Sequence, residues 1–242
     1  MKTEKIMGIP IDNITYETII ADISSYLNSD KKMTAISINP QIVLEVQHYK
    51  DLQNFIHAST HRIPDGIGIV LVSKLLGGNI KERVTGFDLM VKFLEYANEH
   101  RKRCFFYGAK PEVNIDLINN IQKKYPNLII AGGIDGYTKL DDDEIVNQIN
   151  TSKPDFLFVA LGFPKQEKWL SKNIDVLEVS ILQNVGGSFD VLSGHVKRAP
   201  DFYVKNHLEW LYRSLSNPKR IGRIFQLPIF VLKSLFWHIR GK

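Results

Sequence analysis

Cysteine is almost absent from the sequence, with Cys104 as the one cysteine among 242 residues. A single thiol forms no disulfide within the chain and builds no metal site of several cysteines, so both kinds of scaffold are excluded. Cys104 opens the apolar run 104–107, where we expect a buried structural thiol rather than a nucleophile. The composition fits the reducing cytoplasm.

Long apolar runs are missing as well. The sequence has no stretch of 18 uncharged apolar residues, so we expect no membrane-spanning helix. The segment after Met1 is charged and has no apolar core before a small-residue cleavage site, so we expect no signal peptide. With 44% hydrophobic residues, the chain can form one large domain, or one domain with an appendage.

Several site motifs are absent too. No Gly-x-Gly-x-x-Gly follows an expected strand and no Walker A sequence occurs, so a dehydrogenase or a P-loop enzyme lacks its main support. The seven histidines have no metal-ligand spacing, and no Ser/His/Asp or Cys/His pairing stands out. The acidic run 141–143 resembles the Asp-x-Asp metal site of many sugar-nucleotide transferases. It precedes an expected helix, however, and a solvated acidic first turn explains it without a metal.

What the sequence does have is a separation of charge. The net charge is +5, but residues 194–242 contain ten Lys or Arg and two Asp or Glu, a balance of +8. Residues 1–193 contain 21 and 24, a balance of −3. We therefore divide the chain into a body, 1–193, and a basic helical C-terminal appendage, 194–242.

The body alternates between apolar strands and amphipathic helices. We expect strands at 5–9, 33–38, 104–107, 128–131, 155–161 and 180–185, and helices at 15–27, 51–58, 67–76, 87–99, 111–125, 142–149 and 164–172. Near-continuous apolar strands alternating with helices indicate a mostly parallel sheet with helices on both faces, a Rossmann-like α/β fold. Glycine follows each of the last four strands, and ligands of such sheets sit at the carboxyl ends of strands. This pattern favours a nucleotide site there.

Asp65 lies between Pro64 and Gly66, just before an apolar helix. Proline fixes its own φ and glycine allows backbone angles that other residues avoid, so the carboxylate is held at a stiff corner. It could act as a general base for a hydroxyl nucleophile, or bind a ribose or a metal. The alternative is that Asp65 only caps the next helix.

Three further segments place polar groups at strand ends. Ser37 and Asn39 precede a proline that favours a helix start, where free N–H groups suit a pyrophosphate; capping alone is the alternative. Gly162 and Gln166 repeat this arrangement, and Gln166 could donate to a phosphate or a sugar hydroxyl. Gly187 and Asp190 follow the last strand, where Asp190 could bind a ribose or a base edge, or only form an Asx turn.

The appendage combines basic and aromatic residues in two expected helices, 202–215 and 218–239, with a break near Pro228. Arg213, Arg220 and Arg223 interleave with aromatic side chains, which suits an anionic membrane surface. Residues 227–239 are apolar on most faces, which favours lipid or a protein groove over RNA. One alternative is that the appendage packs on the body or on a second copy of the chain. The other is that it binds nucleic acid, which we do not expect as a partner.

Taken in order, these segments resemble the WecG/TagA/CpsF glycosyltransferases, most closely the TagA branch, from about residue 5 to the end. The resemblance is carried by Asn39-Pro40, Pro64-Asp65-Gly66, Arg83 with Thr85-Gly86 and Asp88, Gly162 with Pro164, Gln166-Glu167 and Trp169, and Gly186-Gly187 with Phe189-Asp190, Gly194 and Arg198-Ala199-Pro200. It implies an inverting, metal-independent enzyme without a cofactor. Such an enzyme moves N-acetylmannosamine from its UDP-sugar to undecaprenyl-diphosphate-linked N-acetylglucosamine, a step of wall teichoic acid synthesis at the inner face of the cell membrane.

The resemblance also assigns roles to residues. Asp65 becomes the general base for the acceptor 4-hydroxyl. Without a metal, fixed dipoles and cations must stabilise the leaving UDP. The candidates for that task are Ser37, where the family pattern has a threonine, with Asn39, Arg83, Gln166 and the arginines at 213, 220 and 223. Tyr137 and Asp190 are candidates for the uridine.

Two alternatives remain open from the sequence. A relative within the family would transfer the uronic acid form of the sugar, which needs a cation near the donor carboxylate. A chain of another class would be a non-catalytic nucleotide-binding module at the membrane surface.

Overall fold

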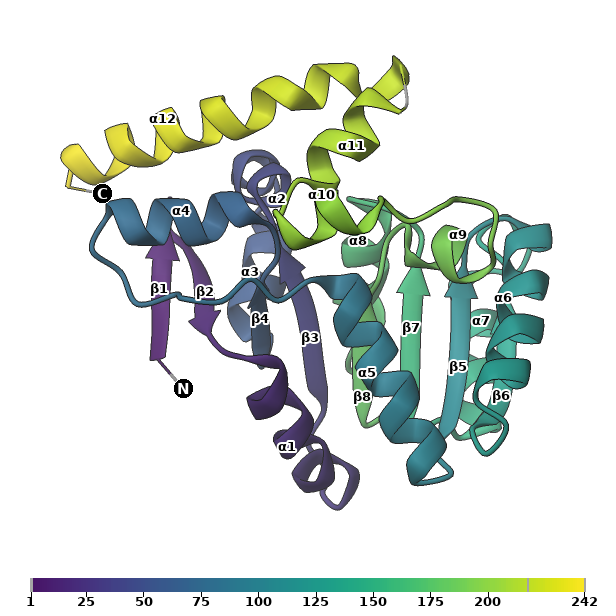
Figure 1. Ribbon diagram of the computed structural model, residues 1–242. Helices are drawn as coiled ribbons and strands as arrows, with labels where there is room; N and C mark the ends of the chain where they lie inside the picture. The colour runs from purple at the N-terminus through teal and green to yellow at the C-terminus, as the bar shows by residue number, and fades with distance from the viewer. Residues whose placement is uncertain (1, 217, 242) are drawn as a thin grey trace.

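The fold is a six-stranded sheet in which all strands run parallel, in a computed structural model that describes residues 2–216 and 218–241 (Figure 1). The strand order is β4-β3-β8-β7-β5-β6. The strands are β3 (Met33–Ile38), β4 (His61–Pro64), β5 (Arg103–Gly108), β6 (Ile129–Ile134), β7 (Phe156–Ala160) and β8 (Ile181–Asn184). The expected α/β class with a parallel sheet is confirmed.

Alternate residues of each strand enter separate cores on the two faces of the sheet. On β5 and β7, Phe106 and Phe158 belong to one core, while Tyr107 and Val159 belong to the other. One face is covered by α1 (Tyr16–Leu27), α5 (Gly86–Glu99), α6 (Pro111–Lys124) and α9 (Ser188–Leu192). The other face is covered by α2 (Pro40–Glu45), η1 (Val46–His48), α3 (Lys50–Ala58), α7 (Asp142–Ser152) and α8 (Lys165–Asn173). Burial on both faces explains why the strands are apolar throughout.

The N-terminal segment differs from the expected single strand at 5–9. It forms an antiparallel hairpin of β1 (Lys2–Ile6) and β2 (Ile9–Asn13), because Met7 and Gly8 both take positive φ angles, 50° and 80°, as a two-residue hairpin turn requires. Strand β4 was not expected, because its start is polar. Arg62 is accommodated there by a bidentate contact with the fully buried Asp12, whose Oδ1 lies 2.9 Å from the guanidinium.

Two glycines that were expected to end a strand lie inside β6 instead. At Gly132 a Cβ atom would come within 2.6 Å of the Phe105 ring, so the strand passes the ring only because this residue has no side chain. The strand register shifts at this point, next to Phe105. The glycine-at-strand-end pattern is therefore wrong for this strand.

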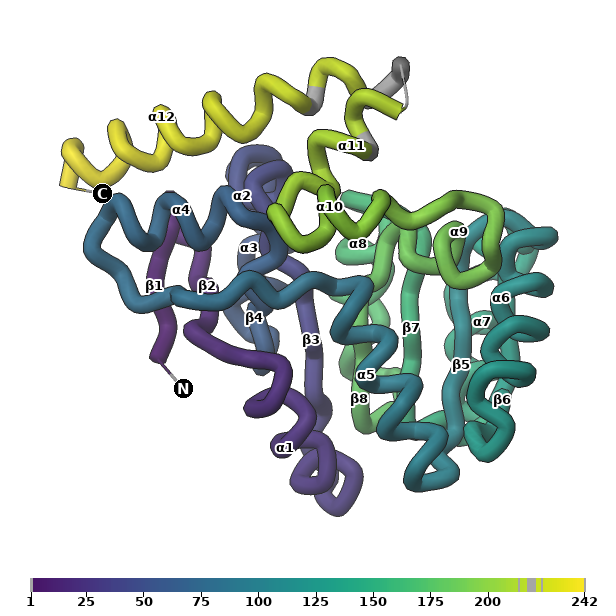
Figure 2. Tube along the Cα trace, viewed as in Figure 1, coloured from purple at the N-terminus to yellow at the C-terminus, as the bar shows by residue number. Residues whose placement is uncertain are grey.

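The appendage folds as α10 (Asp201–Lys205), α11 (Glu209–Leu215), η2 (Pro218–Phe225) and α12 (Gln226–Ile239). The expected helix 202–215 is interrupted at His207, which has a φ of 60°. Pro228 does not break α12, because it lies in the first turn, where the missing N–H has no helical partner. Figures 1 and 2 show α12 crossing over α4 (Ile67–Leu75), and it contacts both α4 and α2. Phe230 of α12 is fully buried in the core that also contains Ile69 and Val72.

Candidate active site

The predicted polar segments converge on the edge where the parallel strands end. In Figure 1 the arrowheads of β5 and β7 point to the side on which the appendage lies. From β3 the chain continues to β4 at the edge of the sheet. The other neighbour of β3 is β8, which the chain enters after β7, from the other half of the sheet. Ligands of open α/β sheets bind at such a change of direction.

Asp65 does not cap the helix that follows it. The N-cap of α4 is Gly66, with a φ of 103° that strongly favours glycine, and no side chain caps this end. The Asp65 carboxylate instead turns to the start of α5, where its Oδ2 accepts from the Gly86 N–H at 3.4 Å. Its own N–H donates to the Ile38 carbonyl at 2.9 Å, which fastens the corner to β3. The capping alternative for Asp65 is therefore wrong.

Ser37 lies beside this corner. A Cβ atom added at Gly86 would be 2.6 Å from Ser37 Oγ and 3.6 Å from Asp65 Oδ2, so the hydroxyl and the carboxylate meet the same helix start. Asn39 is different, because its side-chain oxygen accepts from the Ile42 N–H at 3.0 Å as the N-cap of α2. Capping is thus the task that Asn39 performs in this structure, while Ser37 and Asp65 share one site.

A buried network of side chains joins the ends of β3, β8 and α8. Asn184 Oδ1 accepts from the Ser37 N–H at 2.9 Å, and Asn184 Nδ2 donates to Glu167 Oε1 at 2.8 Å. Gln166 Nε2 donates to the same oxygen at 2.8 Å, and Gln166 Oε1 accepts from the Gly186 N–H at 3.2 Å. We call Ser37, Gln166, Glu167, Asn184 and Gly186 the floor network.

Glu167 is the ionisable centre of the floor network. It is 1% exposed, and burial raises the pKa of its carboxyl, an effect that the hydrogen bonds from Gln166 and Asn184 oppose. Its Oε2 has no hydrogen-bond partner among the residues that the structure describes.

A second network connects the appendage to the body. Arg83 donates to Glu209 Oε2 at 3.2 Å, and Arg198 Nε donates to Glu209 Oε1 at 3.3 Å. Arg198 also donates to Asp88 Oδ1 at 2.7 Å and lies 4.5 Å above the Phe87 ring. We call Arg83, Asp88, Arg198 and Glu209 the rim network. It holds the start of α11, which carries Arg213, against the start of α5.

The remaining predicted residues are spread along the same edge. Gly187 lines a small pocket together with Arg198 and Glu209, and Asp190 lies in α9 rather than in an Asx turn. Gly162 follows β7 with a φ of 75° in open space. The side chains of Arg213, Arg220 and Arg223 lie outside the described part of the structure.

Tyr137 is not brought together with Asp65. It is 70% exposed and follows β6, the strand at the opposite edge of the sheet from β4. Five steps of about 4.8 Å between neighbouring strands separate the two ends by roughly 24 Å. Its role at the uridine stays a prediction.

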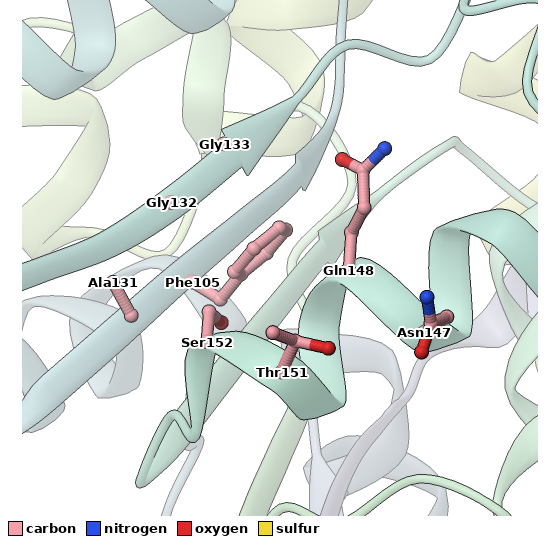
Figure 3. Close-up of a pocket in the computed structure, with 8 residues that line it drawn as sticks. All are labelled: Phe105, Ala131, Gly132, Gly133, Asn147, Gln148, Thr151 and Ser152. Atoms are coloured by element: carbon pink, nitrogen blue, oxygen red, sulfur yellow. The ribbon is translucent and has the colours of Figure 1, made fainter.

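The structure also contains a pocket of about 400 Å³ away from these residues, between β6 and α7 (Figure 3). It is lined by Phe105, Ala131, Gly132, Gly133, Asn147, Gln148, Thr151 and Ser152. It contains no ionisable side chain and none of the predicted site residues, so we do not place the chemistry there.

The acidic run at 141–143 begins α7 as expected. Asp141 and Glu144 form a reciprocal capping box, and Asp142 pairs with Lys172 at 2.6 Å. Within residues 2–216 and 218–241, no group of three or more His, Cys, Asp and Glu side chains could hold a metal ion. No helix in this part of the chain is long and apolar enough to cross a membrane. Cys104 is buried, as expected.

Asn184 and Glu209 were missed from the sequence, and Glu167 appears there only within a motif, with no role at the site. Asn184 lies inside an apolar strand. Glu209 was counted only as one of the two acids of a basic tail. The available signal was that Asn184 and Gln183 are the two amides in an otherwise apolar strand, and polar side chains on a buried strand need partners.

Comparison with known proteins defines the class. A sequence profile of the glycosyl transferase WecG/TagA/CpsF family matches residues 4–242, and the chain belongs to this family. The family resemblance and the expected enzyme class, a hexosyltransferase, are thereby confirmed.

Relatives in two genera have the same name, N-acetylglucosaminyldiphosphoundecaprenol N-acetyl-beta-D-mannosaminyltransferase. The protein of Bacillus spizizenii is 40% identical over 86% of this chain and 80% of its own length. That of Bacillus subtilis strain 168 is 37% identical over 97% and 92%. That of Staphylococcus aureus strain MRSA252 is 34% identical over 94% and 90%.

Proposed function

We propose that this enzyme transfers N-acetylmannosamine from UDP-N-acetylmannosamine to the 4-hydroxyl of undecaprenyl-diphosphate-linked N-acetylglucosamine, with inversion and without a metal ion. The names of the relatives support this sugar and this acceptor. The observation that carries the chemistry is the Asp65 corner, where a carboxylate at the end of β4 faces Gly86 instead of capping its own helix.

In this reaction Asp65 acts as the general base. The acceptor oxygen attacks the anomeric carbon, the bond from that carbon to the β-phosphate oxygen breaks, and its electron pair leaves with UDP. The hydroxyl proton passes to the Asp65 carboxylate. A carboxylate is a weak base for an alcohol, so the transfer occurs late, when the new bond has made the proton acidic.

The departing UDP needs fixed positive groups, because no metal neutralises it. Ser37 and Gln166 would supply polar groups from the floor network, and Arg83 would supply a cation from the rim network. Arg83 is 9% exposed and paired with Glu209, so the diphosphate has to compete with that carboxylate. The engagement of Asp141 as the N-cap of α7, and of Asp142 in an ion pair with Lys172, supports a mechanism without a metal.

We place the enzyme in the cytoplasm, attached peripherally to the inner face of the membrane. Large side chains on α12 remain exposed at spacings that share one helix face, namely Ile229, Leu232, Phe236 and Ile239 at 44–78%. The neighbouring α4 exposes Leu71 and Leu75. An apolar face within a segment of balance +8 suits an anionic lipid surface, where the acceptor's diphosphate also resides.

Turnover with a short-chain lipid acceptor tests the proposal. UDP-N-acetylmannosamine should be used, the uronic acid donor should not, and the product should have the inverted anomeric configuration by NMR. Turnover should persist in EDTA. Preference for the uronic acid would overturn the proposed donor, and no turnover of either donor would overturn the proposed activity. Loss of turnover in EDTA that magnesium restores would overturn the metal-independent mechanism.

A further inference from the structure

Glu167 occupies an unusual position for a carboxylate in the first turn of a helix. The helix dipole stabilises such a group at the surface at little cost, yet Glu167 is 1% exposed. Glu112 offers a contrast, because it occupies the first turn of α6 and its side chain is 57% exposed. Burial of Glu167 therefore has a cause other than the helix dipole.

That cause lies in the two amides that the carboxylate orients. Gln166 and Asn184 both direct their NH₂ groups at Glu167 Oε1, each at 2.8 Å. Their carbonyl oxygens are then left to accept from the N–H groups of Gly186 and Ser37. If either amide turned over, an NH₂ group would face a backbone N–H and the acceptor oxygen would face Glu167. One carboxylate thus fixes the direction of both amides.

The consequence extends over three elements. Gln166 belongs to α8, Asn184 to β8 and Ser37 to β3. Glu167 bonds to the first two side chains, and Asn184 continues the connection to the Ser37 N–H. A carboxylate suits this place because it accepts without donating, so it offers no competing N–H to the two amides.

We propose that Glu167 is a positioning residue for the donor site: it holds Gln166 and, through Asn184, the Ser37 end of β3 in the arrangement that receives the UDP-sugar diphosphate. This rests on the proposed function. Glu167 contacts no reacting atom; it sets where the groups that do so are placed. A displacement of about 1 Å in such groups lowers activity on the order of 100-fold.

The test compares E167L and E167Q with the control E112Q. In E167L both NH₂ groups lose their acceptor, and kcat/KM for the UDP-sugar and the affinity for UDP should fall on the order of 10- to 100-fold. E167Q keeps one carbonyl oxygen for both amides, so its kcat/KM should stay within about threefold. E112Q should match the wild type in every assay.

A second variant covers the case in which E167L does not fold. In N184D the donor to Glu167 is replaced by an oxygen, so UDP binding and transfer should fall. N184D should fold, because its remaining carboxylate oxygen still accepts from the Ser37 N–H. Thermal unfolding of each variant separates loss of fold from loss of positioning.

Two outcomes would overturn the inference: a folded E167L that binds UDP as the wild type does, or a folded N184D that does so. Measurement of UDP affinity by calorimetry keeps this test independent of the transfer reaction. If the wild type binds UDP but transfers no N-acetylmannosamine, the proposed function fails while UDP affinity still decides the role of Glu167.

Discussion

The floor and rim networks surround the same strand ends but are built in opposite ways. The floor consists of buried amides around one carboxylate, with Gln166 and Asn184 only 5% and 2% exposed. The rim consists of ion pairs in which Arg198 and Asp88 side chains are about one-third exposed. Buried hydrogen bonds fix geometry because the alternative is an unpaired polar group, whereas exposed ion pairs exchange partners at little cost. The floor therefore suits placement of the substrate, and the rim suits contacts that substrate replaces.

The largest effect is expected at Asp65, which lies between the two networks. D65N should keep the fold and the affinity for UDP, because an amide has the same shape and size as the carboxylate it replaces, yet lower kcat on the order of 10²- to 10⁴-fold. Single-turnover assays with UDP calorimetry on the same samples measure both quantities. Activity within threefold of the wild type would remove Asp65 from the role of base.

The next largest effect is expected where the appendage meets the body. F230A empties a fully buried site and should lower the free energy of unfolding by about 3–5 kcal/mol. F236A, two turns later and 62% exposed, should change it by less than about 0.5 kcal/mol.

In liposome flotation, F236A should have a larger effect than F230A, the reverse of their order in stability. F236A should weaken binding to anionic vesicles, while F230A should retain its exposed apolar face wherever it is folded. Equal flotation of F236A and the wild type at low and high salt would contradict the membrane assignment of α12.

A smaller effect on stability is expected at the rim. E209Q weakens two ion pairs, one of them with Arg83, whose side chain is 9% exposed, so the free energy of unfolding should fall by about 1–3 kcal/mol. Its affinity for UDP should rise, because Arg83 no longer has a charged partner to exchange. Calorimetry at two salt concentrations, with E144Q as a control on a distant helix, checks this. A loss of UDP affinity in E209Q would show that the rim places Arg83 rather than competing for it.

The smallest effect is expected at the floor as a dependence on pH. The pKa of Glu167 is raised from its ordinary value of 4.5, so the folded chain keeps a proton that the unfolded chain has released. The stabilisation is complete below that ordinary value and is lost as pH rises through the raised pKa. The melting temperature of the wild type minus that of E167Q should therefore fall between pH 4 and the raised pKa, then level off. A difference that rises over this range would contradict the burial argument.

The contrast between the networks also explains how much could be predicted. The parallel sheet, the Asn39 cap and the Pro64–Gly66 corner follow from local rules of periodicity and backbone angles. Strand β4 was missed because its Arg62 is neutralised by Asp12, fifty positions away in the chain. Glu167 was missed for the same reason, since it lies in α8 and its partner Asn184 lies in β8, 17 positions away in the chain. Pairings of polar groups between distant segments leave no periodic signal.

Phe230 has a consequence for the order of folding during synthesis. The ribosome makes this side chain long after the residues of the first half that share its core, including Ile69 and Val72. Domains generally begin to fold as the chain emerges. Until Phe230 is made, the N-terminal half therefore leaves exposed the apolar surface that this side chain later covers. Helix α12 thus completes this core when it docks. A chain released from a ribosome that stalls before residue 230 would expose part of its apolar core, which proteases can recognise.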